Sequence, residues 1–431
     1  MYKQIVVEET VQAAHSRRAT VQIGNKMITT PCYGVLLKKA FELDLFNRDV
    51  SAPNLQLIGL RQSNAPAIIK EHEIRRGYRT LTGEPTEQIY IGMRNTKFWF
   101  VDPCTDLLYY KAPDGKSEQA ELFAKYSPEM QKVLRQFTPA THDQKWQELC
   151  QDEATLMRLI RETCKLQMEA KADFIVPPVP LITADSPLKL VDNWVDLVKT
   201  TGVFAKTNLE LPTAIPLFIH FNCVKRTDTL AYLVKRLNEE VINGGMAEYK
   251  MFLLRVVGEN LEGESREVRE RFKLFIQGIS RLAREAKCAV ALLDIGTVGL
   301  LSIAIGADAF IEPLSGVPCA SGFVGRSKDK HGRYYHPEGM KMVRFADLKA
   351  SYDAQGQKLP CECTACDSIN GNDLAEVPDG VWNETRRRHL VLARNQELNE
   401  ANEAIADNTI RGAISEKVQR SDVKNLLDIL P

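Results

Sequence analysis

Apolar and polar residues alternate regularly through the middle of the chain. Five short apolar runs have the length and composition of buried β-strands, and they lie at 173–178, 215–221, 251–257, 289–294 and 308–312. Four neighbouring segments repeat apolar residues every three to four positions, which predicts helices at 154–170, 229–245, 266–286 and 298–305. Near-continuous apolar strands that alternate with helices are typical of a parallel sheet covered on both faces.

These consecutive strand–helix units predict an α/β fold with the architecture of a TIM-type (β/α)8 barrel. The N-terminal third is long enough to supply the remaining strands, so we assign residues 1–345 to the barrel and 346–431 to a helical subdomain. A doubly wound open sheet is the alternative. The chain contains no G-x-G-x-x-G or Walker motif, which counts against a nucleotide-binding version of that alternative.

Four residues at the ends of the predicted strands are candidates for a site, because barrel enzymes place their chemistry at the carboxyl ends of the strands. Asp294 and Glu312 each close an apolar run, where an acidic group is costly to bury without a partner or a task. We predict that both are catalytic and that Asn222 and Gly258 bind substrate. The alternative for Asp294 is that it only caps the following helix.

Two more acids follow the aromatic run at 98–102. Asp102 ends this run, and Asp106 stands four residues later. Two carboxylates in one site can divide acid and base roles when their environments separate their pKa values. We predict a catalytic role for Asp102 and a substrate-binding role for Asp106, with an ordinary Asp-Pro turn as the alternative.

Three cysteines within six residues, Cys361, Cys363 and Cys366, form the pattern C-E-C-T-A-C. Together with His389 on a following helix, they have the composition of a closed structural Cys3His zinc site. We therefore predict structural Zn²⁺ as the cofactor and residues 346–431 as a C-terminal zinc-binding helical subdomain. His336 is the alternative fourth ligand, and buried or redox-active thiols are the alternative to zinc.

Basic and aromatic residues gather between residues 322 and 345. Such a loop suits phosphate contact and base stacking, so we assign four of its residues to nucleic-acid binding: Arg326, Lys328, Lys330 and Arg333. A solvated surface loop is the alternative. The chain has 56 Lys and Arg residues and 56 Asp and Glu residues, so a nucleic acid must be bound by a local patch and not by net charge.

The compartment is predicted from what the chain lacks. No apolar stretch reaches the length of a membrane span, and the first residues lead directly into mixed polar sequence without the pattern of a secretory signal. The remaining cysteines are scattered, several of them inside apolar runs, as is typical of buried thiols. We expect a cytoplasmic protein with reduced thiols and no membrane contact.

Several segments together resemble a known family. The cysteine pattern with its later histidine is similar to the zinc site of the tRNA-guanine transglycosylase superfamily, the archaeal branch in particular. Residues 332–339 (GRYYHPEG) resemble the G-R-Y-x-x-P-E-G run of that branch. Residues 14–31 resemble its opening β-hairpin, and 306–310 (GADAF) resemble the segment before its nucleophile. The chain also differs from the tRNA enzymes at several motif positions, described below, and these differences fit the paralogues that insert 7-deazaguanine bases into DNA.

The resemblance implies a TIM barrel with a zinc subdomain, acting as a pentosyltransferase. It implies that guanine in DNA or tRNA is replaced by a 7-deazaguanine base through a covalent carboxylate intermediate. It also implies a homodimer packed through the zinc region, or a partner protein. Asp102 takes the place of the proton-handling aspartate of the family. Ile311 stands where the nucleophile belongs, so Glu312 or Asp294 is expected to replace it.

Two other functions stay open, because the motif D-P-C-T-D at 102–106 differs from the family's D-S-G-G-F/Y-Q and no acid stands at 177–179 to read guanine. One is a catalytically altered nucleic-acid-binding paralogue or partner subunit. The other is a barrel hydrolase or lyase that acts on a free nucleoside. A trio of carboxylates in one site would favour base exchange, whereas a Glu312 that points outward would favour the altered paralogue.

Overall fold

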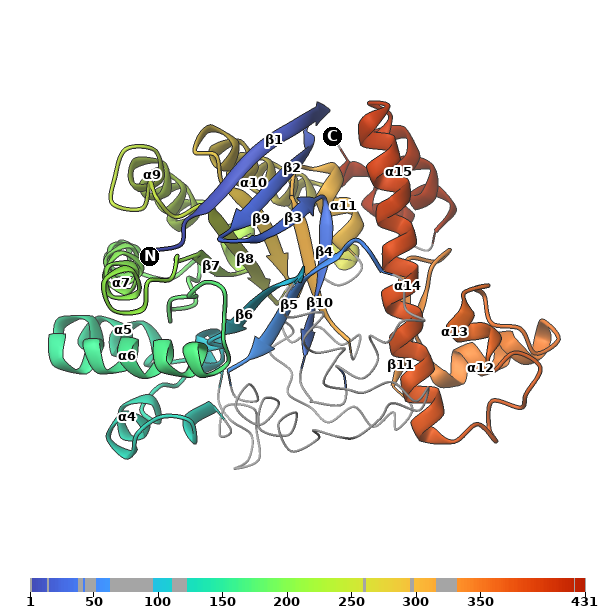
Figure 1. Ribbon diagram of the computed structural model, residues 1–431, viewed down its shortest axis with the longest axis horizontal. Coiled ribbons are helices and arrows are strands. Elements are labelled where there is room, and N and C mark those ends of the chain that lie inside the picture. Colours follow the sequence, from blue (N-terminus) through green and yellow to red (C-terminus); the bar gives the residue numbers. More distant parts are fainter. Residues whose placement is uncertain are drawn as a thin grey trace.

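The protein folds around one curled parallel sheet, with helices on its outer side and a long C-terminal helix along one flank (Figure 1). The computed structural model describes residues 2–13, 15–37, 42, 52–62, 96–110, 122–258, 261–294, 298–314, 332–421 and 423–430. Within these residues, no helix is both long and apolar enough to cross a membrane.

The central sheet has seven strands in the order β6-β5-β4-β10-β9-β8-β7, and all neighbours are parallel. Its strands are β4 (Cys32–Leu37), β5 (Leu55–Arg61), β6 (Phe98–Asp102), β7 (Ile215–His220), β8 (Met251–Val257), β9 (Ala289–Leu293) and β10 (Ala309–Pro313). Nearly every residue of these strands is buried, because helices or loops cover one face and the curled sheet encloses the other. The predicted α/β class and four of the five predicted central strands are confirmed.

The expected closed eight-stranded barrel is not shown, and the sheet forms a curled half-barrel instead. The apolar run at 173–178 lies between β6 and β7 but makes no regular strand. Asp173 donates its backbone N–H to the Trp99 carbonyl at 2.7 Å, and two isolated bridges join Ile175 to Thr213 and Ile182 to Ile219. The physical reason is proline, because Pro177, Pro178 and Pro180 have no N–H to donate to a ladder.

Helices follow the strands as the periodicity predicted. The predicted four are found as α6 (Glu153–Glu169), α9 (Asp228–Ile242), α10 (Arg266–Glu285) and α11 (Gly299–Ala304). Among the described residues before the C-terminal region, the other α-helices are α4 (Pro128–Leu134), α5 (His142–Gln151), α7 (Leu188–Leu209) and α8 (Asn222–Lys225). In α10, Ser265 caps the first turn and an apolar stripe that includes Phe272 and Ile276 faces the core.

An antiparallel sheet covers the amino-terminal end of the parallel strands. It consists of β1 (Ile5–Ala13), β2 (Ser16–Ile23) and β3 (Lys26–Thr30), so the expected hairpin within residues 14–31 is present. Arg17 of β2 fixes it to the parallel sheet, since its Nε and Nη2 atoms each lie 2.8 Å from a carboxylate oxygen of Asp308. Such a two-point contact is the strong form of an ion pair.

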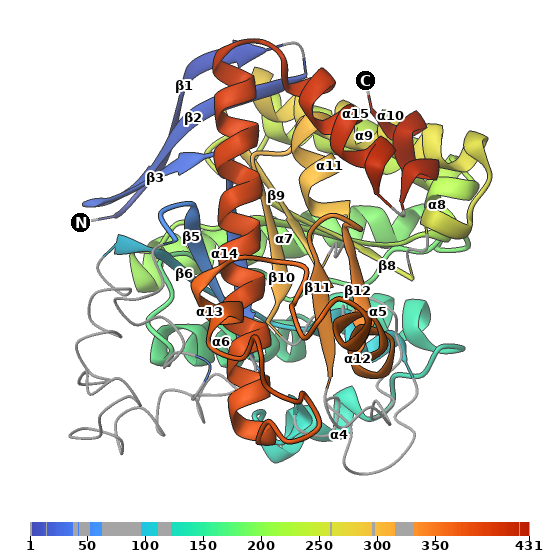
Figure 2. The ribbon, with the colours of Figure 1, turned by 90° about the vertical axis from the view of Figure 1, so that its right-hand side faces the viewer.

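The C-terminal region has a small core of its own and one long helix. It contains β11 (Arg333–His336), β12 (Lys341–Arg344), α12 (Phe345–Ala354), α13 (Thr364–Asp367), α14 (Asp379–Ala406), α15 (Ile410–Arg420) and the 3₁₀-helix η6 (Lys424–Ile429). Tyr334, Tyr352 and Trp382 pack together in the small core. Helix α14 runs from this core along the flank of the parallel sheet to β1 and β2 (Figure 2).

Candidate functional site

Three of the predicted acids meet at one guanidinium on the inner face of the curled sheet. Arg255 of β8 contacts Asp102 at the end of β6, and its Nη1 lies 3.0 Å from Oδ1 of Asp106 in the 3₁₀-helix η2 (Thr105–Tyr109). Its Nη2 lies 3.1 Å from Oδ2 of Asp294, just after β9. All four side chains are at most 6 % exposed. We call these four residues the interior acid cluster.

Strand alternation explains why these side chains converge. Asp102 is paired with Arg61 across β5 and β6, and the Arg61 guanidinium also reaches Asp294, with Nη2 3.7 Å from Oδ2. Arg255 pairs with Leu293 of β9 and lies over the Phe218 ring at 4.8 Å, so it points to the inner face. Neither arginine was predicted from the sequence. The available signal was one charged residue inside the apolar run MFLLRVV.

The pKa values of the two acids near β6, Asp102 and Asp106, are shifted in opposite directions beside Arg255. Burial is the largest single influence on Asp102 and would raise its pKa, but the attraction and hydrogen bonding of Arg255, together with the attraction of Arg61, lower this pKa overall. Burial raises the pKa of Asp106, where Arg255 offsets only part of the effect. The backbone N–H of Cys104 donates to Asp102 at 2.9 Å and also favours its charged form. Neighbouring carboxyl groups with pKa values pushed apart suit a base and an acid.

Asp294 differs from the other two acids in its backbone and in its hydrogen bonding. Its φ of 57° lies in the left-handed region, which costs energy for most residues and is tolerated best by Asp and Asn. Its backbone N–H donates to the Ile311 carbonyl of β10 at 2.8 Å. Within the described part of the chain, no hydrogen bond reaches either carboxylate oxygen, so the contact with Arg255 is an ion pair only.

Aromatic side chains border the cluster at the carboxyl end of β7. The Tyr109 ring lies 5.3 Å from the ring of His142 and 6.0 Å from that of His220. Tyr110 is close enough to Asp106 for that carboxylate to raise the pKa of the phenol, in addition to the larger effect of burial. None of these aromatic residues was singled out from the sequence. They provide apolar surface next to the acids.

The two residues predicted to bind substrate lie at this same edge. The Asn222 side chain accepts a hydrogen bond from the Ala184 N–H at 3.1 Å, so its amide oxygen already has a structural partner. Gly258 has a φ of 76°, and a Cβ there would lie 3.1 Å from Nε2 of His220. Glycine at this position therefore allows the chain to turn closely against the His220 ring.

The structure does not bring Glu312 to the interior acid cluster. Neighbouring residues of a strand point to opposite faces, and Ile311 takes the inner face opposite Gly34. Glu312 points outward to α14, where its Oε1 lies 2.8 Å from Nε of Arg394 and its Oε2 lies 3.2 Å from Nη2. Burial raises the pKa of Glu312, and the attraction of Arg394 offsets part of this effect.

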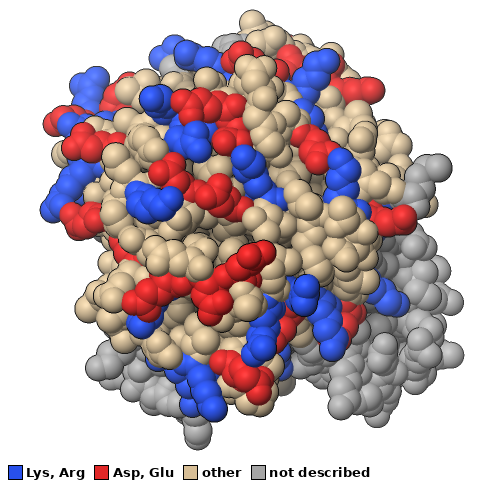
Figure 3. All heavy atoms as spheres, turned by 90° about the vertical axis from the view of Figure 1, so that its left-hand side faces the viewer, with Lys and Arg blue, Asp and Glu red and all other residues tan. Residues whose placement is uncertain are grey.

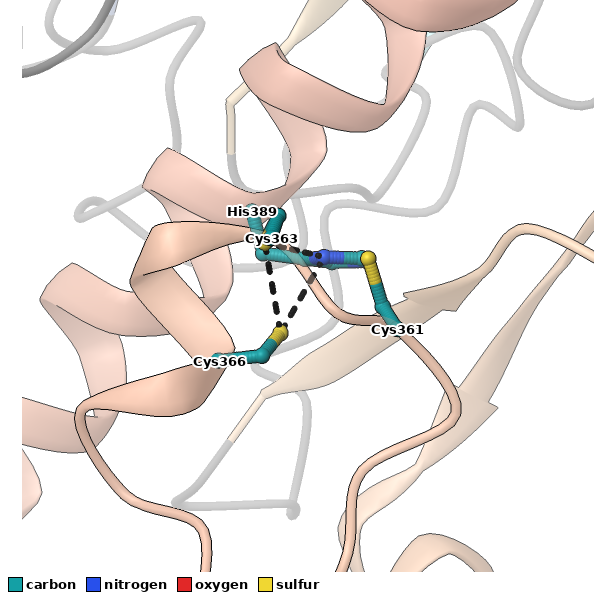
Figure 4. Close-up of side chains that lie close together, drawn as sticks. All are labelled: Cys361, Cys363, Cys366 and His389. Carbon is teal, nitrogen blue, oxygen red and sulfur yellow. Dashed lines mark hydrogen bonds between the residues drawn. The ribbon is translucent and has the colours of Figure 1, made fainter.

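The four predicted metal ligands lie together. The sulfur and nitrogen atoms of Cys361, Cys363, Cys366 and His389 are all within 4.8 Å of one another, and the side chains point toward a common centre (Figure 4). The Sγ atoms of Cys363 and Cys366 are 3.5 Å apart, and His389 Nδ1 lies 3.4 Å and 3.3 Å from them. A tetrahedral zinc ion with bonds of about 2.3 Å to sulfur separates its ligands by about 3.8 Å. The group could therefore hold a metal ion of this kind.

The surroundings of His389 also fit a ligand. Its Nε2–H donates to the Tyr335 carbonyl at 2.7 Å, which leaves the Nδ1 lone pair directed at the sulfurs. The Tyr334 ring is stacked on the imidazole with 4.2 Å between centroids. Hydrogen bonds from the thiols of Cys361 and Cys366 lower the pKa of Cys363 to about 3. The alternative ligand His336 accepts instead from the Gly339 N–H at 3.1 Å and is not a member of the group.

The predicted nucleic-acid-binding residues are only partly described. Arg326, Lys328 and Lys330 lie outside the described residues, whereas Arg333 begins β11 and is exposed. On the described part of the face shown in Figure 3, Lys and Arg are interspersed with Asp and Glu. The described part of this face therefore has mixed charge and not a continuous basic surface.

Comparison with known proteins leaves the function to be inferred from the site itself. No protein-family model matches the chain, and a search of curated proteins finds no match either. The convergence of three carboxylates on Arg255 and the Cys3His group are the two features with evident chemistry.

Proposed function

We propose that this protein is a base-exchange glycosyltransferase that replaces guanine in DNA or tRNA by a 7-deazaguanine base. The observation that carries the proposal is the convergence of Asp102, Asp106 and Asp294 on Arg255 at the carboxyl ends of parallel strands. This edge is where barrel-like α/β proteins place their reacting groups. Exchange of a base through a covalent intermediate needs a nucleophile, an acid and a base, and the cluster offers one carboxyl group for each.

Asp294 is assigned as the nucleophile, because no hydrogen bond among the described residues reaches its oxygens. One of these oxygens forms a bond to the sugar C1′, and the C1′–nitrogen bond breaks with its electron pair passing to guanine. Asp106, whose pKa is raised, gives the departing guanine a proton. The ionised Asp102 then takes a proton from the incoming 7-deazaguanine. The nitrogen freed of that proton attacks C1′ and releases the Asp294 carboxylate.

The metal group belongs to the scaffold in this proposal. A closed set of three thiolates and one histidine leaves no open position for substrate, as is typical of structural zinc. When bound, the ion would cross-link α13, α14 and the segment that directly precedes α13. The nucleic acid would contact basic residues such as Arg333, and a second copy of the chain or a partner protein would complete the assembly.

A second candidate is a nucleic-acid-binding paralogue, or partner subunit, with altered or lost catalysis. Two observations favour it. Arg255 already pairs with all three carboxylates, and a nucleophile held by a buried cation is weakened unless substrate binding displaces that contact. The outward position of Glu312 also leaves the inner face with the apolar Ile311 where the family places its nucleophile.

The test is to incubate the protein with a radiolabelled 7-deazaguanine precursor and, separately, DNA or tRNA. We expect label in one polymer, and a covalent protein–nucleic-acid adduct that resists denaturation. Asp294→Asn should remove the adduct and lower exchange about 10⁴- to 10⁶-fold, the range found for loss of a covalent nucleophile.

Asp353→Asn is the matched control, because Asp353 is an exposed acid on α12 that pairs with Lys349. An Asp294→Asn variant that keeps the adduct would exclude Asp294 as the nucleophile. Nucleic-acid binding without label in either polymer would instead support the altered paralogue.

A further inference from the structure

We propose that Glu312 is a positioning residue that links the metal-bearing helix to Asp294. Glu312 lies near the end of β10 and is bound by Arg394 of α14. The same end of β10 binds the backbone of Asp294. Occupancy of the Cys3His group would therefore set how firmly the carboxylate of Asp294 is placed. The catalytic part of this inference rests on the proposed function, whereas the mechanical link does not.

The first step is the contact between Glu312 and Arg394. Two parallel hydrogen bonds join them, at 2.8 Å and 3.2 Å, and both side chains are at most 3 % exposed. The guanidinium also lies over the Phe310 ring at 5.4 Å. A two-point contact between planar groups fixes orientation as well as distance, so β10 and α14 are joined rigidly at this point.

The second step leads from Arg394 to the metal group. Nη1 of Arg394 donates to the Tyr335 hydroxyl at 2.8 Å and to Oε2 of Glu397 at 2.8 Å. The same hydroxyl donates to Oε1 of Glu397 at 2.7 Å. The backbone carbonyl of Tyr335 accepts the Nε2–H of His389 at 2.7 Å. Hydrogen bonds on both sides of Tyr335, one to its backbone carbonyl and one to its hydroxyl, therefore connect a predicted metal ligand with Glu312 through this residue.

The third step leads from Glu312 to Asp294. The peptide unit just before Glu312 carries the Ile311 carbonyl, which accepts the Asp294 N–H at 2.8 Å. Asp294 lies in a bend directly after β9, and its positive φ needs support from its surroundings. A shift of β10 along or away from β9 would move this carbonyl, and with it the Asp294 backbone. A misplacement of about 1 Å can cost about 10²-fold in rate.

The test is hydrogen–deuterium exchange of the full chain, loaded with zinc and after removal of the metal by a chelator. We expect removal to raise deuterium uptake several-fold at the Asp294 amide as well as within 361–389. In the zinc-loaded state, Tyr335→Phe and Glu312→Gln should already raise uptake at Asp294, and metal removal should then add little there.

Tyr352→Phe is the matched control, because the Tyr352 hydroxyl donates to the carbonyls of Ile369 and Asn372 in the small core that contains Cys366 but lies off this path. Metal removal that loosens 361–389 and leaves Asp294 protected would overturn the inference. So would equal effects of Tyr352→Phe and Tyr335→Phe at Asp294, since the link would then be general loosening.

An activity measurement separates this inference from the proposed function. If base exchange is found, Glu312→Gln should lower kcat by about 10- to 100-fold with little change in KM, as expected for misplacement of a reacting group. If no exchange is found but the deuterium pattern is as expected, the link stands and the proposed function fails.

Discussion

Two buried charge networks lie on opposite faces of the same sheet, and they differ in how completely they are hydrogen-bonded. On the outer face, Arg394 is enclosed by Glu312, Glu397 and the Tyr335 hydroxyl, with hydrogen bonds from Nε and from both terminal nitrogens. On the inner face, Arg255 meets three carboxylates. Its Nε and both oxygens of Asp294 have no hydrogen-bond partner among the described residues.

We interpret this difference as the one between a structural network and the site of the proposed function. A buried polar network that is fully satisfied fixes one arrangement of the chain, whereas unsatisfied buried groups are costly and are retained where a site needs them. The outer network joins α14 to the sheet. Each carboxylate oxygen and each guanidinium nitrogen in it has a hydrogen-bond partner. In the interior acid cluster, the Asp294 carboxylate is ion-paired with Arg255 and Arg61 but accepts no hydrogen bond from the described residues.

The largest expected effect concerns the metal end of the outer network. Wild-type protein should carry about one zinc ion per chain. Cys366→Ser should abolish metal binding and lower the melting temperature strongly, because structural zinc sites supply about 10–16 kcal/mol of binding free energy in small domains. Metal analysis and thermal unfolding measure both quantities.

Cys150→Ser is the control for this substitution, since Cys150 is a half-buried cysteine of α5 outside the metal group. It should keep the metal and nearly the same melting temperature. A wild-type protein that is folded without metal, and equally stable with it, would contradict a structural ion at this position.

An intermediate effect is expected on the free energy of unfolding, where one substitution in each network can be compared. Arg394→Met leaves Glu312 and Glu397 buried with their main countercharge removed, and should lower the free energy of unfolding by about 3–5 kcal/mol. Asp294→Asn removes a charge that has no hydrogen bond, and should change this free energy by less than about 1 kcal/mol. Urea unfolding curves give both values. Equal losses would mean that the two networks have the same structural role.

The smallest expected effect is a change of about tenfold in the rate of base exchange per pH unit. A base must be ionised, so exchange should fall as the pH drops through the lowered pKa of Asp102. An acid must be protonated, so exchange should also fall as the pH rises through the raised pKa of Asp106. Asp106→Asn should remove only the alkaline limb. Carboxyl ¹³C shifts followed against pH give the same order of pKa values independently of activity, and the reverse order would exchange the two roles.

The elements that could be predicted from the sequence are those whose pattern is local. Apolar runs and helical periodicity sufficed for β7 to β10 and for the four helices beside them, and cysteine spacing sufficed for the metal group. The missing strand at 173–178 shows the limit of this pattern. An apolar run predicts burial, which is observed, but the prolines in it prevent the ladder.

The candidate site was predicted only in part, because it depends on which face each side chain takes. Where a strand is buried on both sides, alternation gives no sign of the inner face, so Glu312 and Asp294 were equivalent candidates. The sequence marks Arg255 only as one charged residue among apolar neighbours in β8, which does not show what it contacts. Its importance comes from three strand ends that meet only after folding.

Helix α14 is one continuous element of 28 residues, about 40 Å long. It carries a predicted metal ligand, His389, then Arg394, which meets β10, and then Asn402, whose amide donates to the Pro31 carbonyl at 3.3 Å. One inserted residue would turn everything after it by about 100°. An insertion or deletion between these three residues would therefore break at least one of their contacts, whereas exchange of exposed side chains of α14 would leave all three contacts in place.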